Sequence, residues 1–430
     1  MRFHKTIFIV VGLLIIFSCS KEKDTQSPVI TIDLPTHLQL INSGDTIQIK
    51  GVVTDNNNIK SIRVVLRDDN NIPALSAINL QVNSTRYELS ELYFFNDIHM
   101  NTGTYTFTIS ASDGENITTK YIDVSVGAVP KVRERVFVFD NVANTTSVYQ
   151  LDNALNTSLF KTINGDFIGG IANSYYQQII SVGSATGNAT AIDAEFATNL
   201  WEVSTITTPP TPYFTTAFSD NKTPYLGYYD GEIKGFDAGG NVNFAAHAVN
   251  GFYCESGFVH ENYLVTEQVN ITRTNFRFGL YYLFSGASYL QFLIFEDIIG
   301  MYSFKPNEIV LISNDASGNA KLSFFNISAN GFSSPFSIGS GKIDATEEVG
   351  KGLYLISKNG DIRLINANTF TSQTYLSAVN ANKIKYDVYT DELYLIDGNV
   401  LTVYDFSSKT LKGSYTHTNP ILDVAFMYNR

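Results

Sequence analysis

The sequence predicts an all-β protein, in which a β-sandwich precedes a seven-bladed β-propeller that the C-terminal strand closes. Three observations predict this fold class. Apolar and polar residues alternate with a period of two in short segments, as they do in strands with one buried face. Pairs of such segments recur seven times between residues 135 and 430. The chain also holds 25 tyrosines and 30 phenylalanines, and aromatic side chains favour strands.

Residues 1–18 are predicted to be a signal peptide. Arg2 and Lys5 precede an apolar run of eleven residues, 7–17, which suits the core of a signal peptide and is too short to span a bilayer as a helix. Residues 16–19, Ile-Phe-Ser-Cys, resemble the bacterial lipobox, in which a cysteine after a small residue is acylated and becomes the new N-terminus. The resemblance implies lipidation of Cys19. A plain signal peptide with an incidental cysteine and an uncleaved anchor helix stay open as alternatives.

A lipid on Cys19 would hold the protein at a membrane, because each buried CH₂ group contributes about 0.8 kcal/mol. We therefore expect a lipoprotein of the outer membrane, on either the cell surface or the periplasmic face. The polar residues 19–27 are predicted to be the tether between lipid and first domain. Cys254 is the only other cysteine, so the lipidated chain has no intramolecular disulfide, and we expect Cys254 to be buried.

Residues 28–127 are predicted to form an immunoglobulin-like β-sandwich. Alternating segments predict strands at 29–32, 47–50, 61–66, 105–109 and 122–126. Turn-forming residues predict turns at 42–45, 55–58, 101–103 and 113–116.

The segment 103–116, followed by 121–126, resembles the closing hairpin of bacterial Ig-like, PKD and cadherin-like modules. This resemblance implies a spacer or adhesion unit. Asp55 and Asp113 lie in predicted loops and carry oxygen atoms that calcium accepts as ligands. A turn-forming role accounts for both, so the sequence predicts no metal site.

Residues 128–134 are predicted to link the sandwich to the propeller at 135–430. The seven repeats begin 38 to 47 residues apart, which is the length of a four-stranded propeller blade. The first repeat lacks a preceding strand, whereas residues 420–428 form an extra strand after the last repeat. We therefore expect that strand to complete the first blade and close the ring.

The repeats resemble degenerate propellers of the YVTN, WD40 and quinoprotein-like kind, which are common in lipoproteins of Bacteroidetes-type bacteria. Residues 191–202 are similar to the tryptophan-docking repeat of quinoproteins, but they lack its Thr-Gly turn. Trp201 is the only tryptophan, and the chain has no vicinal cysteines. We therefore expect no quinone and no other cofactor, and we expect Trp201 to pack between blades.

The charge of the chain argues against nucleic-acid binding. The formal net charge is -12, and no stripe of lysine or arginine is present to displace counterions from a phosphate backbone. Nucleic acids are therefore excluded as the expected partner.

The sequence contains no recognisable catalytic motif, and the chain is not predicted to be an enzyme. A propeller brings distant residues together at its axis, so a few side chains are still candidates for a site in the central funnel. They are the histidines His247 and His260, and the adjacent acidic pairs Glu296 with Asp297 and Glu347 with Glu348.

These observations favour a binding or interaction module, in which the propeller faces engage a protein, peptide or polysaccharide. Two alternatives stay open. One is a scaffold for envelope assembly, and the other is an enzyme of the lyase or glycosidase type that uses the central funnel. Propellers host all three functions, so the fold alone does not separate them.

Overall fold

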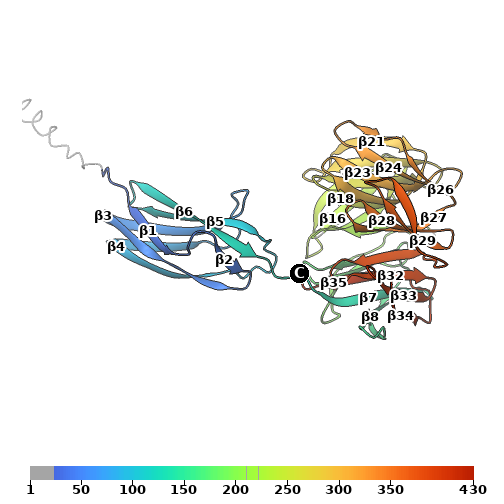
Figure 1. Cartoon of the computed structure of the whole chain (residues 1–430), viewed down its shortest axis with the longest axis horizontal. Helices are drawn as coiled ribbons and strands as arrows, with labels where there is room; N and C mark the ends of the chain where they lie inside the picture. The colour runs from blue at the N-terminus through green and yellow to red at the C-terminus, as the bar shows by residue number, and fades with distance from the viewer. Residues whose placement is uncertain (1–23, 210, 221) are drawn as a thin grey trace, which may run out of the picture. The chain divides into compact units, whose positions relative to one another are not determined.

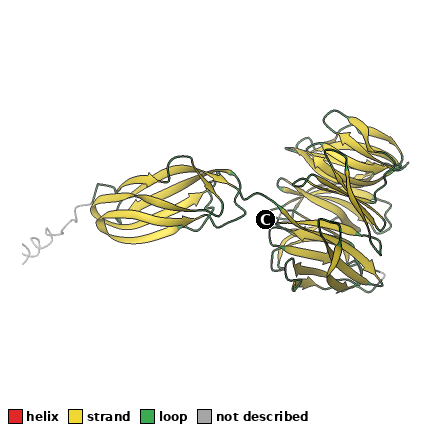
Figure 2. Cartoon of the chain, turned by 60° about the horizontal axis from the view of Figure 1, so that its bottom comes forward, coloured by secondary structure: helices red, strands yellow, loops and turns green. Residues whose placement is uncertain are grey.

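The structure is a computed structural model, and it describes residues 24–209, 211–220 and 222–430. The predicted signal peptide, Cys19 and most of the predicted tether lie outside the described residues. All regular elements in the described residues are strands (Figure 2), so the all-β prediction is confirmed. No helix among these residues is long and apolar enough to cross a membrane. The chain divides into two compact units, residues 1–130 and 131–430.

The described strands of the first unit form one hydrogen-bonded sheet in the order β1-β3-β5-β6-β2, and β4 pairs with β3 (Figure 1). Its strands are β1 (Val29–Leu34), β2 (Gln39–Asn42), β3 (Thr46–Arg67), β4 (Ile78–Phe94), β5 (Gly103–Ser112) and β6 (Ile117–Gly127).

Period-two alternation places the core of this unit. Every second residue of β5 is buried, including Phe107 and Ile109, and these side chains pack against Val124 and Val126 of β6. The predicted turn at residues 55–58 is wrong, because β3 runs through it without interruption. Its pairing with β4 shifts register between Thr54 and Ile59, so the Asn-rich segment is an irregularity within a strand.

The second unit consists of seven small sheets. The first sheet has the order β35-β7-β8-β9, so the C-terminal strand β35 (Asp423–Tyr428) pairs with β7 (Arg133–Val142), followed by β8 (Thr145–Leu151) and β9 (Thr157–Asn164). The second sheet consists of β10 (Gly169–Asn173), β11 (Gln178–Val182), β12 (Ala189–Asp193) and β13 (Asn199–Val203). The third consists of β14 (Phe214–Ser219), β15 (Pro224–Tyr228), β16 (Glu232–Phe236) and β17 (Val242–His247). The fourth consists of β18 (Phe252–His260), β19 (Tyr263–Asn270), β20 (Phe276–Tyr282) and β21 (Ser288–Ile294). The fifth sheet consists of β22 (Asp297–Lys305), β23 (Glu308–Asn314), β24 (Asn319–Asn326), β25 (Gly331–Phe332) and β26 (Phe336–Ser340). The sixth consists of β27 (Ile343–Gly350), β28 (Leu353–Lys358), β29 (Asp361–Asn366) and β30 (Thr371–Leu376). The seventh consists of β31 (Lys383–Asp387), β32 (Glu392–Asp397), β33 (Val400–Asp405) and β34 (Leu411–Thr416).

The innermost strands of these sheets contact one another in a ring. Each of β10, β14, β18, β22, β27 and β31 contacts the next, and β35 contacts both β31 and β10. Sheets arranged in this way around an axis form a β-propeller.

The apolar cores lie between neighbouring sheets. The second strand of a sheet is covered on both faces, and all five residues of β11 and of β15 are buried. One core cluster joins the last sheet to the first, with Tyr394 and Ile396 on one side and Val136 and Val138 on the other. Cys254 is buried with a free thiol, as expected.

Candidate functional site

A polar cavity of about 240 Å³ lies in the central channel of the propeller. It is bounded by the innermost strands of four consecutive sheets, β22, β27, β31 and β35. Its charged lining residues are Asp344, Glu347, Lys383, Lys385 and Asp423.

Two lysines of this cavity converge on one carboxylate. Lys383 and Lys385 lie two residues apart on β31, so their side chains point to the same side of the strand. Their Nζ atoms lie 3.4 and 3.9 Å from Oδ1 of Asp423. The lysine side chains are 40% and 37% exposed, whereas that of Asp423 is 10% exposed. The charge of Asp423 raises the pKa of Lys385, which therefore keeps its proton.

Glu347 is the lining residue of the cavity whose pKa lies near neutral pH. Burial raises its pKa to about 7, although the charge of Lys385 and a hydrogen bond from the Tyr386 backbone N–H lower it. That N–H donates to Oε1 of Glu347 over 3.3 Å. A carboxyl group with this pKa exchanges its proton close to neutral pH.

Glu348, the neighbour of Glu347, does not line the cavity. Successive side chains of a strand point to opposite faces, so the two carboxylates serve different environments. Burial raises the pKa of Glu348, and its charge in turn raises the pKa of Glu347.

The two candidate histidines belong to different sheets. His247 ends β17, and its Nδ1 lies 2.6 Å from the carbonyl oxygen of Ala248. His260 ends β18 and is buried, with Nδ1 2.9 Å from Oγ of Ser303. Its Nε2 is buried without a hydrogen-bond partner, and burial lowers its pKa. Neither ring is a lining residue of the channel cavity.

The acidic pair Glu296 and Asp297 is also divided between two environments. Glu296 accepts a hydrogen bond from Oγ of Ser313 over 2.6 Å and pairs with Nζ of Lys321 at 3.2 Å. Asp297 is the first residue of β22 and pairs in register with Asn314. Neither residue lines the channel cavity.

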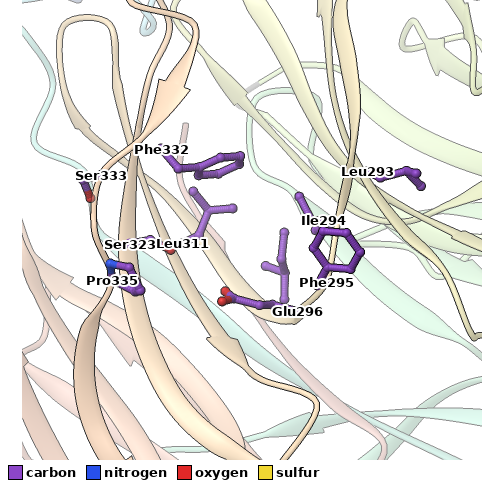
Figure 3. Close-up of a pocket in the computed structure, with 10 residues that line it drawn as sticks. Leu293, Ile294, Phe295, Glu296, Leu311, Ser323, Phe332, Ser333 and Pro335 are labelled. Atoms are coloured by element: carbon purple, nitrogen blue, oxygen red, sulfur yellow. The ribbon is translucent and has the colours of Figure 1, made fainter.

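A second, apolar cavity of about 230 Å³ lies between the sheet that ends in β21 and the sheet that contains β25 and β26. Figure 3 shows Phe332 and Leu311 on one side and Ile294 and Phe295 on the other, with Glu296 between them. The complete lining is Leu293, Ile294, Phe295, Glu296, Ile298, Leu311, Ser323, Phe332, Ser333 and Pro335.

The rim of this cavity exposes apolar side chains. Phe295 is 85% exposed, and Leu293 is 53% exposed. β21 is the outer strand of its sheet, so one of its edges has no strand partner within that sheet. On the facing side, β25 and β26 both pair with β24, and Pro335 lies between them. Glu296 is the one lining residue of this cavity that the sequence singles out as a candidate, because the others come from two repeats and look like ordinary core or loop residues.

Three carboxylates of the first unit lie close enough together to share a metal ion. Oxygen atoms of Asp24, Asp55 and Asp113 all lie within 4.8 Å of one another. Asp55 and Asp113 were noted from the sequence as oxygen donors, whereas Asp24 was not, because it lies in an unpatterned polar segment. Hydrogen bonds from Gln26 and Asn116 backbone N–H groups lower the pKa of Asp24 and Asp113.

Comparison with known proteins gives structural likenesses only. No protein-family model matches the chain, and no curated protein matches it. The β-propeller domain of Cps50 (Swd1) from Myceliophteria thermophila is similar over 60% of this chain and 88% of its own, at 8% identity and a TM-score of 0.46. BamB from Moraxella catarrhalis is similar over 69% of this chain and 89% of its own, at 12% identity and a TM-score of 0.40. A chain of the Mitotic Checkpoint Complex is similar over 68% of this chain and 87% of its own, at 11% identity and a TM-score of 0.49.

Proposed function

We propose that this chain is a lipid-anchored protein of the bacterial outer membrane whose propeller binds a partner protein. In this proposal, Cys19 carries the lipid, residues 19–27 are the tether, and residues 28–127 form an immunoglobulin-like spacer. Residues 128–134 link the spacer to a seven-bladed propeller at 135–430, closed by β35. The predicted export signal and Cys19 support the location at the membrane. The ring of innermost strands supports the closed propeller.

The apolar cavity beside β21 is the observation that carries the binding function. Its volume of about 230 Å³ is smaller than most sites for free small molecules, which measure roughly 300–1,000 Å³. A space of this size accommodates one or two large side chains. The polar groups of Glu296 are already bonded to Ser313 and Lys321, so the cavity offers mainly apolar contacts.

The edge of β21 indicates how a partner would approach. An outer strand has backbone N–H and C=O groups along one side that a further strand can pair with. We therefore infer that the partner presents an extended segment with a large apolar side chain, which enters the cavity next to Phe295. The exposed apolar edge equally suits the scaffold alternative, in which the partner is another envelope component. A polysaccharide would need more hydrogen-bonding groups than the two serines, Ser323 and Ser333, that line this cavity.

Site-specific cross-linking tests the binding proposal. A photoreactive phenylalanine analogue replaces Phe295 in the full-length protein in its native cells. The matched control carries the analogue at Phe196, which is 69% exposed in the turn between β12 and β13. We expect one protein to be cross-linked at 295 and absent at 196. The purified partner should then bind the wild-type protein and lose at least tenfold in affinity with Phe295→Asp. Equal cross-linking at both positions, or no protein adduct at 295, would contradict the proposal.

The lipid anchor needs its own test. Metabolic labelling with an alkyne fatty acid should tag the wild-type protein and leave Cys19→Ala untagged. The wild-type protein should also fractionate with the outer membrane. Labelling that persists in the variant would exclude Cys19 as the acylated residue.

A further inference from the structure

We propose that the channel cavity is a second binding site, which takes a small organic acid through its carboxylate group. This inference is independent of the protein-binding proposal, because the two cavities share no residue.

The first argument is the state of the lysine donors. Lys383 and Lys385 both direct Nζ towards one carboxylate oxygen of Asp423, at 3.4 and 3.9 Å. These contacts are ion pairs in which neither ammonium group makes a hydrogen bond to a described residue. Each ammonium has three N–H donors. Both lysines line the cavity, so these donors are available to an acceptor oxygen of a ligand inside it.

The second argument is the local charge. Two ammonium groups are opposed by one nearly buried carboxylate, Asp423. Asp344 lies at the exposed end of the lining, where water screens its charge. When Glu347 is protonated, the two lysines and the two aspartates of the lining balance in charge. Because Asp344 lies at the exposed end, a carboxylate in the inner part of the cavity meets mainly the two lysines and Asp423.

The third argument is size. A volume of about 240 Å³ lies below the roughly 300–1,000 Å³ of most small-molecule sites, so a ligand here is no larger than one acidic sugar. A polymer or a folded domain does not fit into this space. The ligand class is therefore a free small organic acid, including a sugar acid.

Protonation of Glu347 should control this site. As an ionised group it repels a bound carboxylate, whereas the protonated carboxyl can donate a hydrogen bond to it. The groups that act on Glu347 are Glu348 on β27, Lys385 and the Tyr386 N–H on β31, Asp423 on β35 and Tyr302 on β22. If only the protonated form binds, the dissociation constant rises about tenfold between pH 6 and pH 8.

Calorimetric titration of the full chain with galacturonate tests the proposal. Galactose is the matched control ligand, since it has a CH₂OH group in place of the carboxylate, and acetate tests the carboxylate alone. We expect galacturonate to bind at pH 6, galactose not to bind, and Lys385→Met to weaken galacturonate at least tenfold. Lys409→Met removes a lysine outside the cavity and should leave affinity unchanged.

Glu347→Gln provides a second readout that keeps the side-chain volume. The variant should bind galacturonate with an affinity that no longer changes between pH 6 and pH 8. Binding of galactose as strong as that of galacturonate would overturn the proposal. So would the absence of acid binding in a wild-type protein whose unfolding transition is intact, or a pH dependence that Glu347→Gln retains.

Discussion

Among single residues, the three clustered carboxylates of the first unit oppose one another when all are ionised. Burial raises the pKa of Asp55, and the charges of Asp113 and Asp24 raise it further. Oδ2 of Asp55 is also buried without a hydrogen-bond partner. The ionised form of Asp55 is therefore a source of instability when no cation is present.

Asp55→Asn should stabilise the first unit in buffer that contains a chelator. The amide removes one charge and can still accept the hydrogen bond that Asp55 takes from the Asn56 N–H at 2.8 Å. We expect the free energy of unfolding to rise by about 0.5–1 kcal/mol, the scale of partly exposed charge pairs. Denaturant unfolding of both proteins measures this, with Asp33→Asn as a control outside the cluster. A loss of stability in Asp55→Asn would contradict the prediction.

Glu267 is a residue whose protonation should make the stability of the propeller depend on pH. It is buried, and burial raises its pKa to about 8 from a usual value of 4.5. Its carboxylate oxygens accept hydrogen bonds from the Ile298 N–H at 2.8 Å and from Oγ of Ser256 at 3.0 Å. The folded state therefore holds a proton that the unfolded state releases between these two pH values.

Glu267→Gln should flatten the dependence of stability on pH. Because the folded pKa is raised, the stability due to Glu267 is complete below pH 4.5 and is lost as the pH rises to about 8. The slope in this window is about 1.4 kcal/mol per pH unit. The variant lacks this loss, so its advantage over the wild type should grow from pH 5 to pH 8 in denaturant unfolding. Parallel curves for the two proteins would rule out a protonated Glu267.

The channel residues show what sequence reasoning can and cannot reach at this scale. Glu347 is a site candidate from the sequence because it stands beside another carboxylate. Lys385 and Asp423 are not, because each is an ordinary charged residue of an alternating strand. Only the ring of strands brings β27, β31 and β35 together, and which of their residues face the channel depends on strand orientation. The sequence pattern does not show which face of each strand is turned towards the channel.

At the scale of elements, β35 joins the two ends of the propeller. It pairs with β7 over Asp423 to Tyr428, and its Met427 is fully buried against the core of the first sheet. Arg133 of β7 adds ion pairs to Asp387 at 2.9 Å and Glu392 at 2.6 Å in the last sheet. The junction therefore combines backbone pairing, apolar packing and buried charge.

Met427→Ala should destabilise the propeller by about 2–5 kcal/mol, the usual cost of removing a large buried side chain. Leu411→Ala on β34 is the control, because Leu411 is 55% exposed and should cost less than about 0.5 kcal/mol. Thermal and denaturant unfolding compare the two variants. Equal effects would mean that β35 contributes no more than a surface strand.

Repeats and alternation predict elements best where one face is regularly buried. The seven recurring segment pairs correspond to strands in all seven sheets of the second unit. In contrast, β4 was not predicted, because most of its residues are partly or fully exposed and its sequence is rich in polar side chains. The Asn-rich stretch at 55–58 favoured a turn by composition, but tertiary pairing with β4 and β5 keeps β3 extended on both sides of it.

At the scale of the whole molecule, the two compact units each have their own core. The first unit keeps its apolar cluster within residues 30–126, and the clusters of the second unit join neighbouring sheets of the propeller. Units of this kind usually unfold separately.

Limited proteolysis should therefore cut the chain near residues 128–131 and leave two stable fragments. Calorimetry of the full chain should show two transitions, and each isolated fragment should reproduce one of them. Mass spectrometry identifies the cut. A single cooperative transition that vanishes on cleavage would show that the units depend on each other for stability.

The pairing of β35 with β7 also sets the order in which the molecule can be completed. During synthesis β7 is made near the start of the second unit, whereas its neighbour β35 is made after all the other described strands of that unit. Until then, β7 has an open side and the final core cluster is incomplete. A nascent chain that stalls anywhere before β35 should be far more prone to aggregation or protease attack than a chain in which β35 has paired with β7.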